Sequence, residues 1–280
     1  MISDVCQNKT TIYQKTKIMK NSTFKLFSLL MLLAFILVSC SKENLQDINS
    51  RSQMGIINSC SNIPMSSSVD LKAAQKIAGM HNQYIDRAFK SGELNKARGE
   101  YDVINVFKQL DRCTLNKKAL SAKGRDLVLK NILSAPSYQY LNNAFALCED
   151  LDKRSYSYLN SAIDSIEILV SNNVKDPNEK LAVLTGLAVL DSSAYFWMPE
   201  NMGGSGVGFG YIQKSTGVNS VTLRVSGEWL LADAESATIG MFYVAVAGAV
   251  SAGTATPGAL VGVAVTSAAA SAVSALKSWW

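Results

Sequence analysis

The chain has 280 residues, of which 48% are hydrophobic and 18% are charged, and its formal net charge is +5 at pH 7. The first 39 residues hold five lysines and one aspartate, so the rest of the chain has 22 basic and 21 acidic residues. This balance lacks the positive charge that nucleic-acid binding requires, and it excludes that class of partner. The remaining length of about 240 residues suffices for one substantial domain or two small ones.

The N-terminal segment has the features of an export signal. Lysines precede an uncharged apolar run, Leu26 to Val38, and the small residue Ser39 then comes before Cys40. This order is typical of a cleaved signal peptide. The run is short beside the about 20 apolar residues that span a bilayer, which makes an uncleaved anchor the weaker alternative. We predict a signal peptide over residues 1–39, with Met19 as an alternative start.

Residues 37–40 read Leu-Val-Ser-Cys and resemble a bacterial lipobox. In bacterial lipoproteins the cysteine of this motif is acylated and becomes the first mature residue, and the resemblance implies the same for Cys40. Several acyl chains anchor a protein firmly, because each buried methylene contributes about 0.8 kcal/mol. The resemblance further implies a lipid-anchored protein of the Gram-negative outer membrane that faces the cell surface. The membrane is therefore the first expected partner.

The segment after Cys40 is predicted to be a tether that leads to a helical domain. Residues 40–67 are rich in Ser, Asn and Gln and contain few large apolar residues, so burial cannot offset the entropy of ordering them. Helical periodicity begins at Ser68 and predicts a bundle over residues 68–198. The expected helices span about 69–90, 93–112, 117–133, 137–150, 153–170 and 177–197.

The clearest helix start is at Asp176, Pro177 and Glu179. The aspartate can cap the helix, the proline needs no hydrogen bond there, and the glutamate lies in the first turn. The helix that follows, residues 177–197, is apolar nearly all round, which is typical of a central buried helix. The predicted fold is mainly α, an irregular helical bundle with a C-terminal Ala/Gly-rich helical hairpin.

Glycines dominate the segment after this helix. Five of them lie between positions 203 and 210, and no Lys-Ser/Thr follows them as a phosphate-binding loop requires. We predict a Gly-rich linker over residues 199–227, with short strands near 220–225.

The C-terminal tract has no charged residue between Glu235 and Lys277. Thr256, Pro257 and Gly258 predict a turn, so the tract is expected to form an apolar helical hairpin over residues 228–280. Small residues recur at about every fourth position, which lets helix backbones approach closely, as in membrane helix pairs. The glycines expected to serve helix packing or the membrane hairpin are Gly240, Gly248, Gly253, Gly258 and Gly262.

Length does not decide whether this hairpin enters a bilayer. An arm of about 18 residues is about 27 Å long, against a hydrocarbon core of about 30 Å. We favour packing of the hairpin in a soluble core against residues 177–197, and conditional membrane insertion is the alternative. Asp233 and Glu235 fit both cases as acids in the first turn of the first arm.

The tract that runs from Ala232 through Gly240, Gly248 and Gly253 resembles the glycine-zipper segments of bacteriocin-like peptides and the apolar hairpins of pore-forming colicins. The resemblance implies a membrane-active role. Residues Gly79-Met80-His81-Asn82 with Asp86, the aromatic cluster Tyr195-Phe196-Trp197 and the Ala/Gly-rich end are similar in layout to uncharacterised secreted bacterial proteins. That likeness implies no activity.

Candidate catalytic groups are few. His81 is the single histidine, and Ile77 and Ile85 lie four residues to either side, which places its ring on an apolar helix face. We predict a core histidine bonded to a buried group rather than a proton-transfer residue. The carboxylate pairs Glu149/Asp150 and Asp233/Glu235 are expected to cap or solvate helix ends rather than to face each other across a cleft.

The remaining cysteines and the tyrosines leave alternatives open. Cys60, Cys113 and Cys148 allow one intramolecular disulfide with three pairings, of which we favour Cys113 with Cys148. Four tyrosines could form a carbohydrate platform, although helix contacts are the preferred interpretation. These are Tyr138, Tyr140, Tyr156 and Tyr158.

These observations predict a non-enzymatic lipoprotein with no cofactor and no metal. The leading hypothesis is a membrane-active or antagonistic, bacteriocin-like role, in which the bundle recognises a protein or glycan receptor and the small-residue hairpin inserts. The alternative is a non-catalytic structural or binding lipoprotein whose hairpin stays in the soluble core. An enzyme is the third hypothesis.

Overall fold

The computed structural model describes residues 69–111, 115–121, 124–216, 225–248, 250–251 and 254–277, and this part of the chain is mainly α-helical. Cys40, Cys60, Cys113, Gly253 and the predicted signal peptide and tether lie outside the described residues. The first described elements are α3 (Val69–Lys90), the 3-10 helix η3 (Leu94–Lys96), α4 (Glu100–Asp111), α5 (Lys117–Leu120), α6 (Arg125–Ile132) and α7 (Ala135–Ala146).

The elements of the second half include the longest apolar helices. They are η4 (Leu151–Lys153), α8 (Tyr156–Asn173), α9 (Pro177–Trp197), η5 (Glu200–Met202), α10 (Val207–Thr216), α11 (Gly227–Val246), the two-residue strands β1 (Val250–Ser251) and β2 (Thr254–Ala255), and α12 (Pro257–Lys277). The strands pair antiparallel between α11 and α12, with Val250 opposite Ala255 and Ser251 opposite Thr254. The C-terminal segment is therefore a helical hairpin, as predicted.

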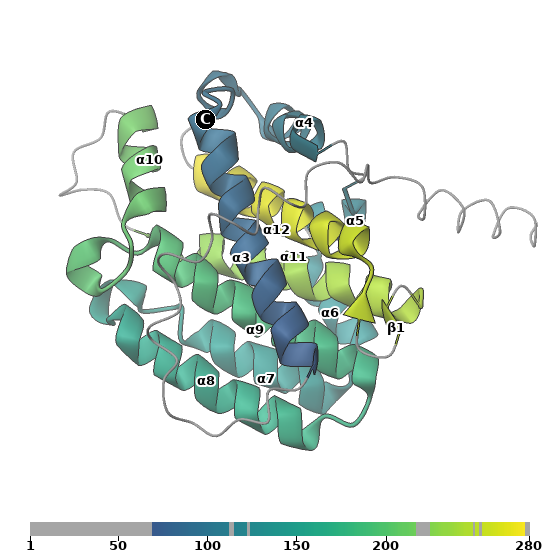
Figure 1. Cartoon of the computed structure of the whole chain (residues 1–280). Coiled ribbons are helices and arrows are strands. Elements are labelled where there is room, and N and C mark those ends of the chain that lie inside the picture. The colour runs from purple at the N-terminus through teal and green to yellow at the C-terminus, as the bar shows by residue number, and fades with distance from the viewer. Residues whose placement is uncertain are drawn as a thin grey trace, which may run out of the picture. The chain divides into compact units, whose positions relative to one another are not determined.

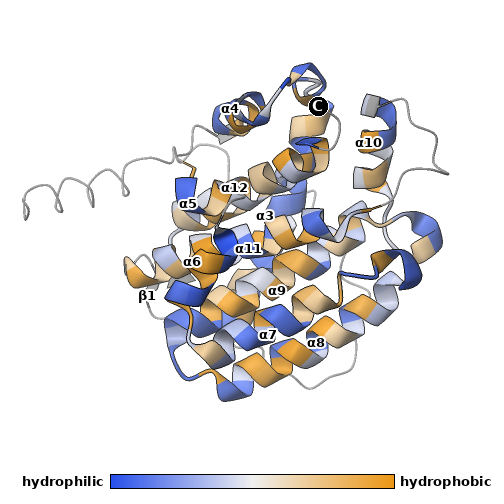
Figure 2. Cartoon of the chain, turned by 180° about the vertical axis from the view of Figure 1, so that it is seen from behind, coloured by the Kyte–Doolittle hydropathy of each residue, from blue (hydrophilic) through white to orange (hydrophobic). Residues whose placement is uncertain are grey.

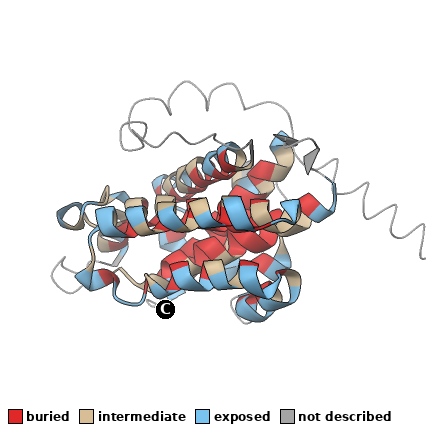
Figure 3. Cartoon of the chain, turned by 90° about the horizontal axis from the view of Figure 1, so that it is seen from below, coloured by how far each residue is buried: buried red, intermediate tan, exposed pale blue. Residues whose placement is uncertain are grey.

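Helix α9 is at the centre of the bundle (Figure 1). It packs against α3, α11, α8 and α7, and α12 packs on both α11 and α3. Orange, hydrophobic residues cover α9, and buried residues gather where the helices face one another (Figures 2 and 3). All the described helices belong to one compact unit, so the hairpin is a part of the bundle.

The start of α9 follows from local chemistry. One oxygen of Asp176, Oδ1, accepts hydrogen bonds from the backbone N–H groups of Asn178 and Glu179, both at 2.9 Å, and Pro177 occupies the first turn. These contacts satisfy amides that would otherwise have no partner in the helix. The predicted cap and the predicted range 177–197 are confirmed.

The bundle between α3 and α8 is more broken than predicted. The range 69–90 is confirmed, but the predicted helix over 93–112 is the 3-10 helix η3 followed by α4, because Ala97 is extended. The predicted helix over 117–133 is two helices, since Ser121 is extended and Gly124 has a φ of +101°. Pro136 lies in the first turn of α7 rather than after a helix end.

The prediction of a Gly-rich linker is wrong for most of residues 199–216. This stretch contains η5 and α10, and Gly203 ends η5 with a φ of +88°. A Cβ added at Gly204 would collide with the carbonyl oxygen of Met198, and one at Gly208 would collide with the Trp197 and Phe196 rings. These glycines allow close packing rather than flexibility. The strands predicted near 220–225 fall almost wholly outside the described residues.

Candidate functional site in the apolar hairpin

The hairpin α11–α12 supplies much of the core. Every residue of α12 from Val263 to Val273 is buried. Helix α12 is also the one described helix that is long and apolar enough to cross a membrane, and 83% of its most apolar 18-residue window lies inside the protein. Ser226 caps the start of α11, since its hydroxyl accepts a hydrogen bond from the Glu228 amide at 3.2 Å.

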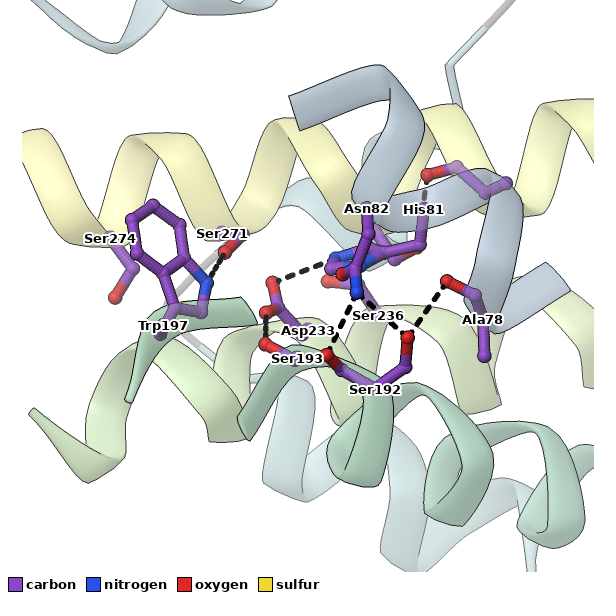
Figure 4. Close-up of polar contacts among 12 residues, drawn as sticks. Ala78, His81, Asn82, Ser192, Ser193, Trp197, Asp233, Ser236, Ser271 and Ser274 are labelled. Carbon is purple, nitrogen blue, oxygen red and sulfur yellow. Dashed lines mark hydrogen bonds and ion pairs between the residues drawn. The ribbon is translucent and has the colours of Figure 1, made fainter. Parts of the chain in front are cut away.

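A buried polar cluster joins α11 to α3 and α9 (Figure 4). Asp233 on α11, His81 on α3 and Ser193 on α9 are all 0% exposed. The Ser193 hydroxyl donates a short hydrogen bond to Asp233 Oδ2. His81 Nε2 lies 3.3 Å from Asp233 Oδ1, an ion-pair distance whose angles do not make a hydrogen bond. The Asp233 carboxylate therefore connects the hairpin to helices α3 and α9.

The other ring nitrogen of His81 extends this polar cluster toward the surface. His81 Nδ1 is 2.9 Å from Asn82 Oδ1, while Asn82 Nδ2 donates to both the carbonyl and the hydroxyl oxygen of Ser192, each at 2.8 Å. The Ser192 hydroxyl donates to the Ala78 carbonyl oxygen at 3.2 Å. A second contact fixes α12, since Trp197 Nε1 donates to the Ser271 hydroxyl at 3.1 Å (Figure 4).

Further polar contacts connect the hairpin to α5 and α6. Arg125 Nε on α6 donates to Glu235 Oε2 at 2.7 Å, and the Ser236 hydroxyl donates to the Ala119 carbonyl oxygen at 2.6 Å. Burial raises the pKa of Glu235, and the hydrogen bond from Arg125 opposes that rise. Each of these contacts satisfies a polar group that the apolar core would otherwise leave unpaired.

The arrangement of serine, aspartate and histidine is not that of a nucleophilic triad. A triad needs the serine hydroxyl bonded to the histidine, which then removes its proton. Here the Ser193 hydroxyl is bonded to Asp233, and all three side chains are closed to solvent. The prediction that His81 lies in the core is confirmed, but its hydrogen-bond partner is the half-buried Asn82 rather than a buried group.

The prediction that Asp233 and Glu235 are first-turn acids is wrong. Helix α11 begins at Gly227 and its first-turn acid is Glu228, so Asp233 and Glu235 lie in the second and third turns. Asp233 is consequently inside the core, and Glu235 pairs with Arg125. The other predicted pair, Glu149 and Asp150, is exposed, and Asp150 pairs with Lys153 at 2.9 Å.

The predicted small-residue glycines have different environments. Gly240 faces α12, because an added Cβ would lie 3.4 Å from Val263 Cγ1. Gly248 has a φ of +71° just after the last turn of α11, where it lies open and ends the helix, and Gly262 likewise faces open space. Gly258 lies in the first turn of α12, and Gly253 is outside the described residues. A packing role is therefore wrong for Gly248 and Gly262.

Among the described glycines, the tightest contact between two helices is at Gly186 of α9. A Cβ added there would collide with the Thr238 hydroxyl of α11 and lie 3.2 Å from the Ala234 carbonyl oxygen. Both Gly186 and Thr238 are buried. Sequence reasoning missed this position, although Gly186 is the single glycine in an otherwise apolar helix and could have signalled a close approach.

Cys148 and the tyrosines also differ in part from expectation. Cys148 is a buried free thiol whose pKa is raised to about 12 by burial, so the favoured Cys113–Cys148 disulfide is wrong. Tyr138 donates a short hydrogen bond to Asp126, and Tyr156 packs on Tyr195 with ring centroids 5.2 Å apart. Tyr138 and Tyr156 are thus used in helix contacts, and Tyr158 is 52% exposed.

Within the described part of the chain, no three His, Cys, Asp or Glu side chains are placed so that they could hold a metal ion. Comparison of the chain with protein-family models, curated proteins and solved structures finds no match.

Proposed function

We propose that this chain is a non-catalytic binding lipoprotein of the cell envelope, anchored by acylated Cys40 at the surface of a Gram-negative outer membrane, with its hairpin packed in the soluble core. The Leu-Val-Ser-Cys sequence at residues 37–40 supports the anchor. A protein or glycan receptor is the expected partner class. The bundle provides a folded surface held near the membrane by the tether.

One observation favours a hairpin packed in the bundle over a hairpin inserted in the membrane. Helix α12 contributes an unbroken buried run from Val263 to Val273, so its apolar surface is already covered by α11, α3, α4 and α5. Insertion would require the hairpin to leave the bundle. That would expose the apolar faces of α9 and α3 and would break the contacts of Asp233 and Ser271.

The placement of the titratable groups supports a non-catalytic role. The single histidine is 0% exposed and faces a carboxylate that is also 0% exposed. A general base must reach a substrate proton at about 2.6–3.2 Å, directly or through one water. His81 has no such access while the bundle is folded.

Anchoring is tested by mass spectrometry of the mature protein from its own host, with Cys40→Ser as the variant. We expect an acylated N-terminal Cys40 in membrane fractions, and we expect Cys40→Ser to leave them. An unmodified thiol with the leader still attached would refute the anchor. Protease treatment of intact cells then tests surface exposure, since a periplasmic protein would be protected.

A membrane-active role is the second candidate, and the composition of the hairpin favours it. No charged residue occurs from Ser236 to Leu276, and α12 at 21 residues is about 31 Å long, which matches a bilayer core of about 30 Å. In this alternative the cluster of Asp233, His81 and Ser193 would hold the hairpin in the bundle until a receptor releases it.

Dye release from liposomes separates the two candidates. The unacylated Cys40→Ser protein should cause no leakage if the hairpin stays in the core. Leakage that Gly262→Leu abolishes would favour the membrane-active role. Gly262 is suited to this test because an added Cβ has no neighbour within 4 Å in the folded bundle. Gly79→Leu in α3 is the matched control, since Gly79 also faces open space but lies outside the hairpin.

A further inference from the structure

Helix α8 lies at an edge of the bundle (Figure 1). It packs against α9 and lies beside α7. One side of α8 is buried against these helices and carries Leu159, Ile163, Glu167 and Val170. The opposite side is turned toward solvent, and two large side chains on it, Tyr158 and Leu169, are 52% and 47% exposed.

The outward side of α8 carries no charge. Every exposed residue of α8 is a serine, asparagine, tyrosine or leucine, and every exposed residue of α7 is an alanine, proline, glutamine or asparagine. The exposed residues of α3, by contrast, include Lys72, Lys76, Arg87 and Lys90. A solvated helix face usually has charged residues, whereas the core of a protein interface is depleted of them. The outward side of α8 therefore has the charge pattern of a contact surface.

Four outward residues of α8 lie on one line along the helix, which we call the outer stripe. They follow one another at steps of four, three and four residues and are Tyr158, Ala162, Ser165 and Leu169. Steps of this kind bring side chains onto the same face and are typical of residues that meet a second helix. The two acids of α8, Asp164 and Glu167, do not belong to the stripe and are not exposed.

The outer stripe is complementary to itself. Its spacing is the same from either end, with two small residues in the middle and two large ones outside. If a second α8 crosses it in the antiparallel direction, small residues meet at the crossing point and Tyr158 lies beside Leu169 of the second copy. Small residues allow close approach there, and the gap between crossing helices widens toward the ends, where large side chains fill it. A twofold dimer requires a self-complementary patch of this kind.

The serine hydroxyls of this face already have partners within α8. The Ser161 hydroxyl donates to the Ser157 carbonyl oxygen, and the Ser165 hydroxyl donates to the Ser161 carbonyl oxygen, both at 2.9 Å. A helix that covers them therefore leaves no hydroxyl donor unsatisfied, whereas a glycan would need donors that these two serines do not offer. The absence of charge on the stripe favours a second copy, because two copies of a charged stripe would repel each other.

We propose that two copies of this chain associate through the outer stripes of α8, with the helices antiparallel and crossing at Ala162 and Ser165. Tyr158 and Leu169 fill the two ends of the contact, and the uncharged surface of α7 flanks it. The dimer goes beyond the proposed function, since it concerns how the binding module assembles and not what it binds or how it is anchored.

Sedimentation equilibrium of the unacylated Cys40→Ser protein tests the dimer, in a reducing buffer so that no disulfide joins two copies. We expect a monomer–dimer equilibrium with a Kd of about 10–100 µM, as for a small interface. Ser165→Lys should weaken the association by about tenfold or more, because it places like charges at the crossing point. Circular dichroism checks that this variant of an exposed residue remains folded.

Ser157→Lys is the matched control. Ser157 is also exposed on α8, but it lies about 100° around the helix from Tyr158 and therefore off the outer stripe. This variant should associate as the unchanged chain does. An equal mixture of Ser165→Lys and Ser165→Glu chains should form dimers again, since opposite charges then meet.

Two results would overturn the dimer. A chain that is monomeric at every concentration up to about 500 µM would leave the outer stripe to a helix of a different protein. Association that Ser165→Lys does not weaken would place the contact elsewhere on the bundle. Neither result depends on Cys40 acylation or on dye release, so failure here is distinguishable from failure of the proposed function.

Discussion

Asp233 and Glu167 are both buried carboxylates, yet their surroundings are opposite. Asp233 lies where α3, α9 and α11 meet and accepts a hydrogen bond from Ser193 beside the His81 ring. Glu167 is buried on α8, and burial together with the charges of Asp164 and Asp191 raises its pKa. Asp233 therefore joins the helices through one hydrogen-bonded oxygen and a neighbouring imidazole, whereas burial and two like charges raise the pKa of Glu167.

The difference also separates two parts of the bundle. The α9–α11–α12 core is closed and held by polar contacts between helices, such as Trp197 to Ser271. The α8 edge is partly open, with Leu169 at 47% and Tyr158 at 52% exposed. The core is thus closed to solvent, whereas the α8 edge is a solvent-facing surface of the bundle.

The largest expected effect is that of Asp233→Ala. Removal of this carboxylate leaves the buried Ser193 hydroxyl without its acceptor and takes away the negative charge 3.3 Å from His81 Nε2, and breaking such a buried pair costs about 3–5 kcal/mol. Urea denaturation of the folded domain measures the loss. Glu228→Ala on the same helix is the control, because Glu228 is exposed. A loss below about 1 kcal/mol would show that the cluster is not a structural contact.

Gly186→Ala should produce the next largest loss. The new methyl group would collide with the Thr238 hydroxyl, so α9 and α11 must separate or Thr238 must give up its bond to the Ala234 carbonyl oxygen. Overpacking of this kind costs about 1–3 kcal/mol. Thermal unfolding followed by circular dichroism measures it. A stability equal to that of the unchanged chain would mean that the two helices are not tightly packed here.

Sequence patterns predicted the mainly α fold and the two helices with the clearest signals, residues 69–90 and 177–197. Asp176 and Pro177 fix the start of α9 locally, so its boundary needed no tertiary information. The breaks near Ala97 and Gly124 lie between short segments that pack on α3, α11 and α12, and periodicity alone does not contain that information. The Gly-rich segment was wrongly predicted to be a linker, because glycine occurs both in flexible segments and where helices pack closely.

In the candidate site, too, local sequence predicted some features and only tertiary packing determined the others. The spacing of Ile77, His81 and Ile85 predicted a buried ring, and the ring is buried. Its pairing with Asp233 joins residues far apart in the chain, so only the packing of α3 against the hairpin brings them together. Glu167, by contrast, follows Leu159 and Ile163 at four-residue steps on the buried face of α8, and the helical pattern alone could have identified it as a buried acid.

Glu167→Gln should stabilise the protein at alkaline pH. The carboxyl pKa is about 8 in the folded chain and ordinarily 4.5, so the folded state binds more protons between these values. The contribution of Glu167 to stability is therefore most favourable below about pH 4.5 and is lost as pH rises through about 8. The amide does not titrate, and we expect a gain of about 1–2 kcal/mol at pH 9 that vanishes near pH 4. Denaturation at both pH values measures it, and a gain independent of pH would contradict the assignment.

Gly262→Ala should give the smallest effect, and its sign should be opposite to that of Gly186→Ala. Gly262 is inside α12, where an added methyl group meets open space and the loss of glycine flexibility favours the folded state. Alanine is more stable than glycine in a helix interior by about 0.5–1 kcal/mol. Parallel unfolding of the two variants measures the contrast. A loss of stability would instead show that Gly262 lies at a packed interface. The small-residue pattern would then be correct that the glycines of α12 serve helix packing.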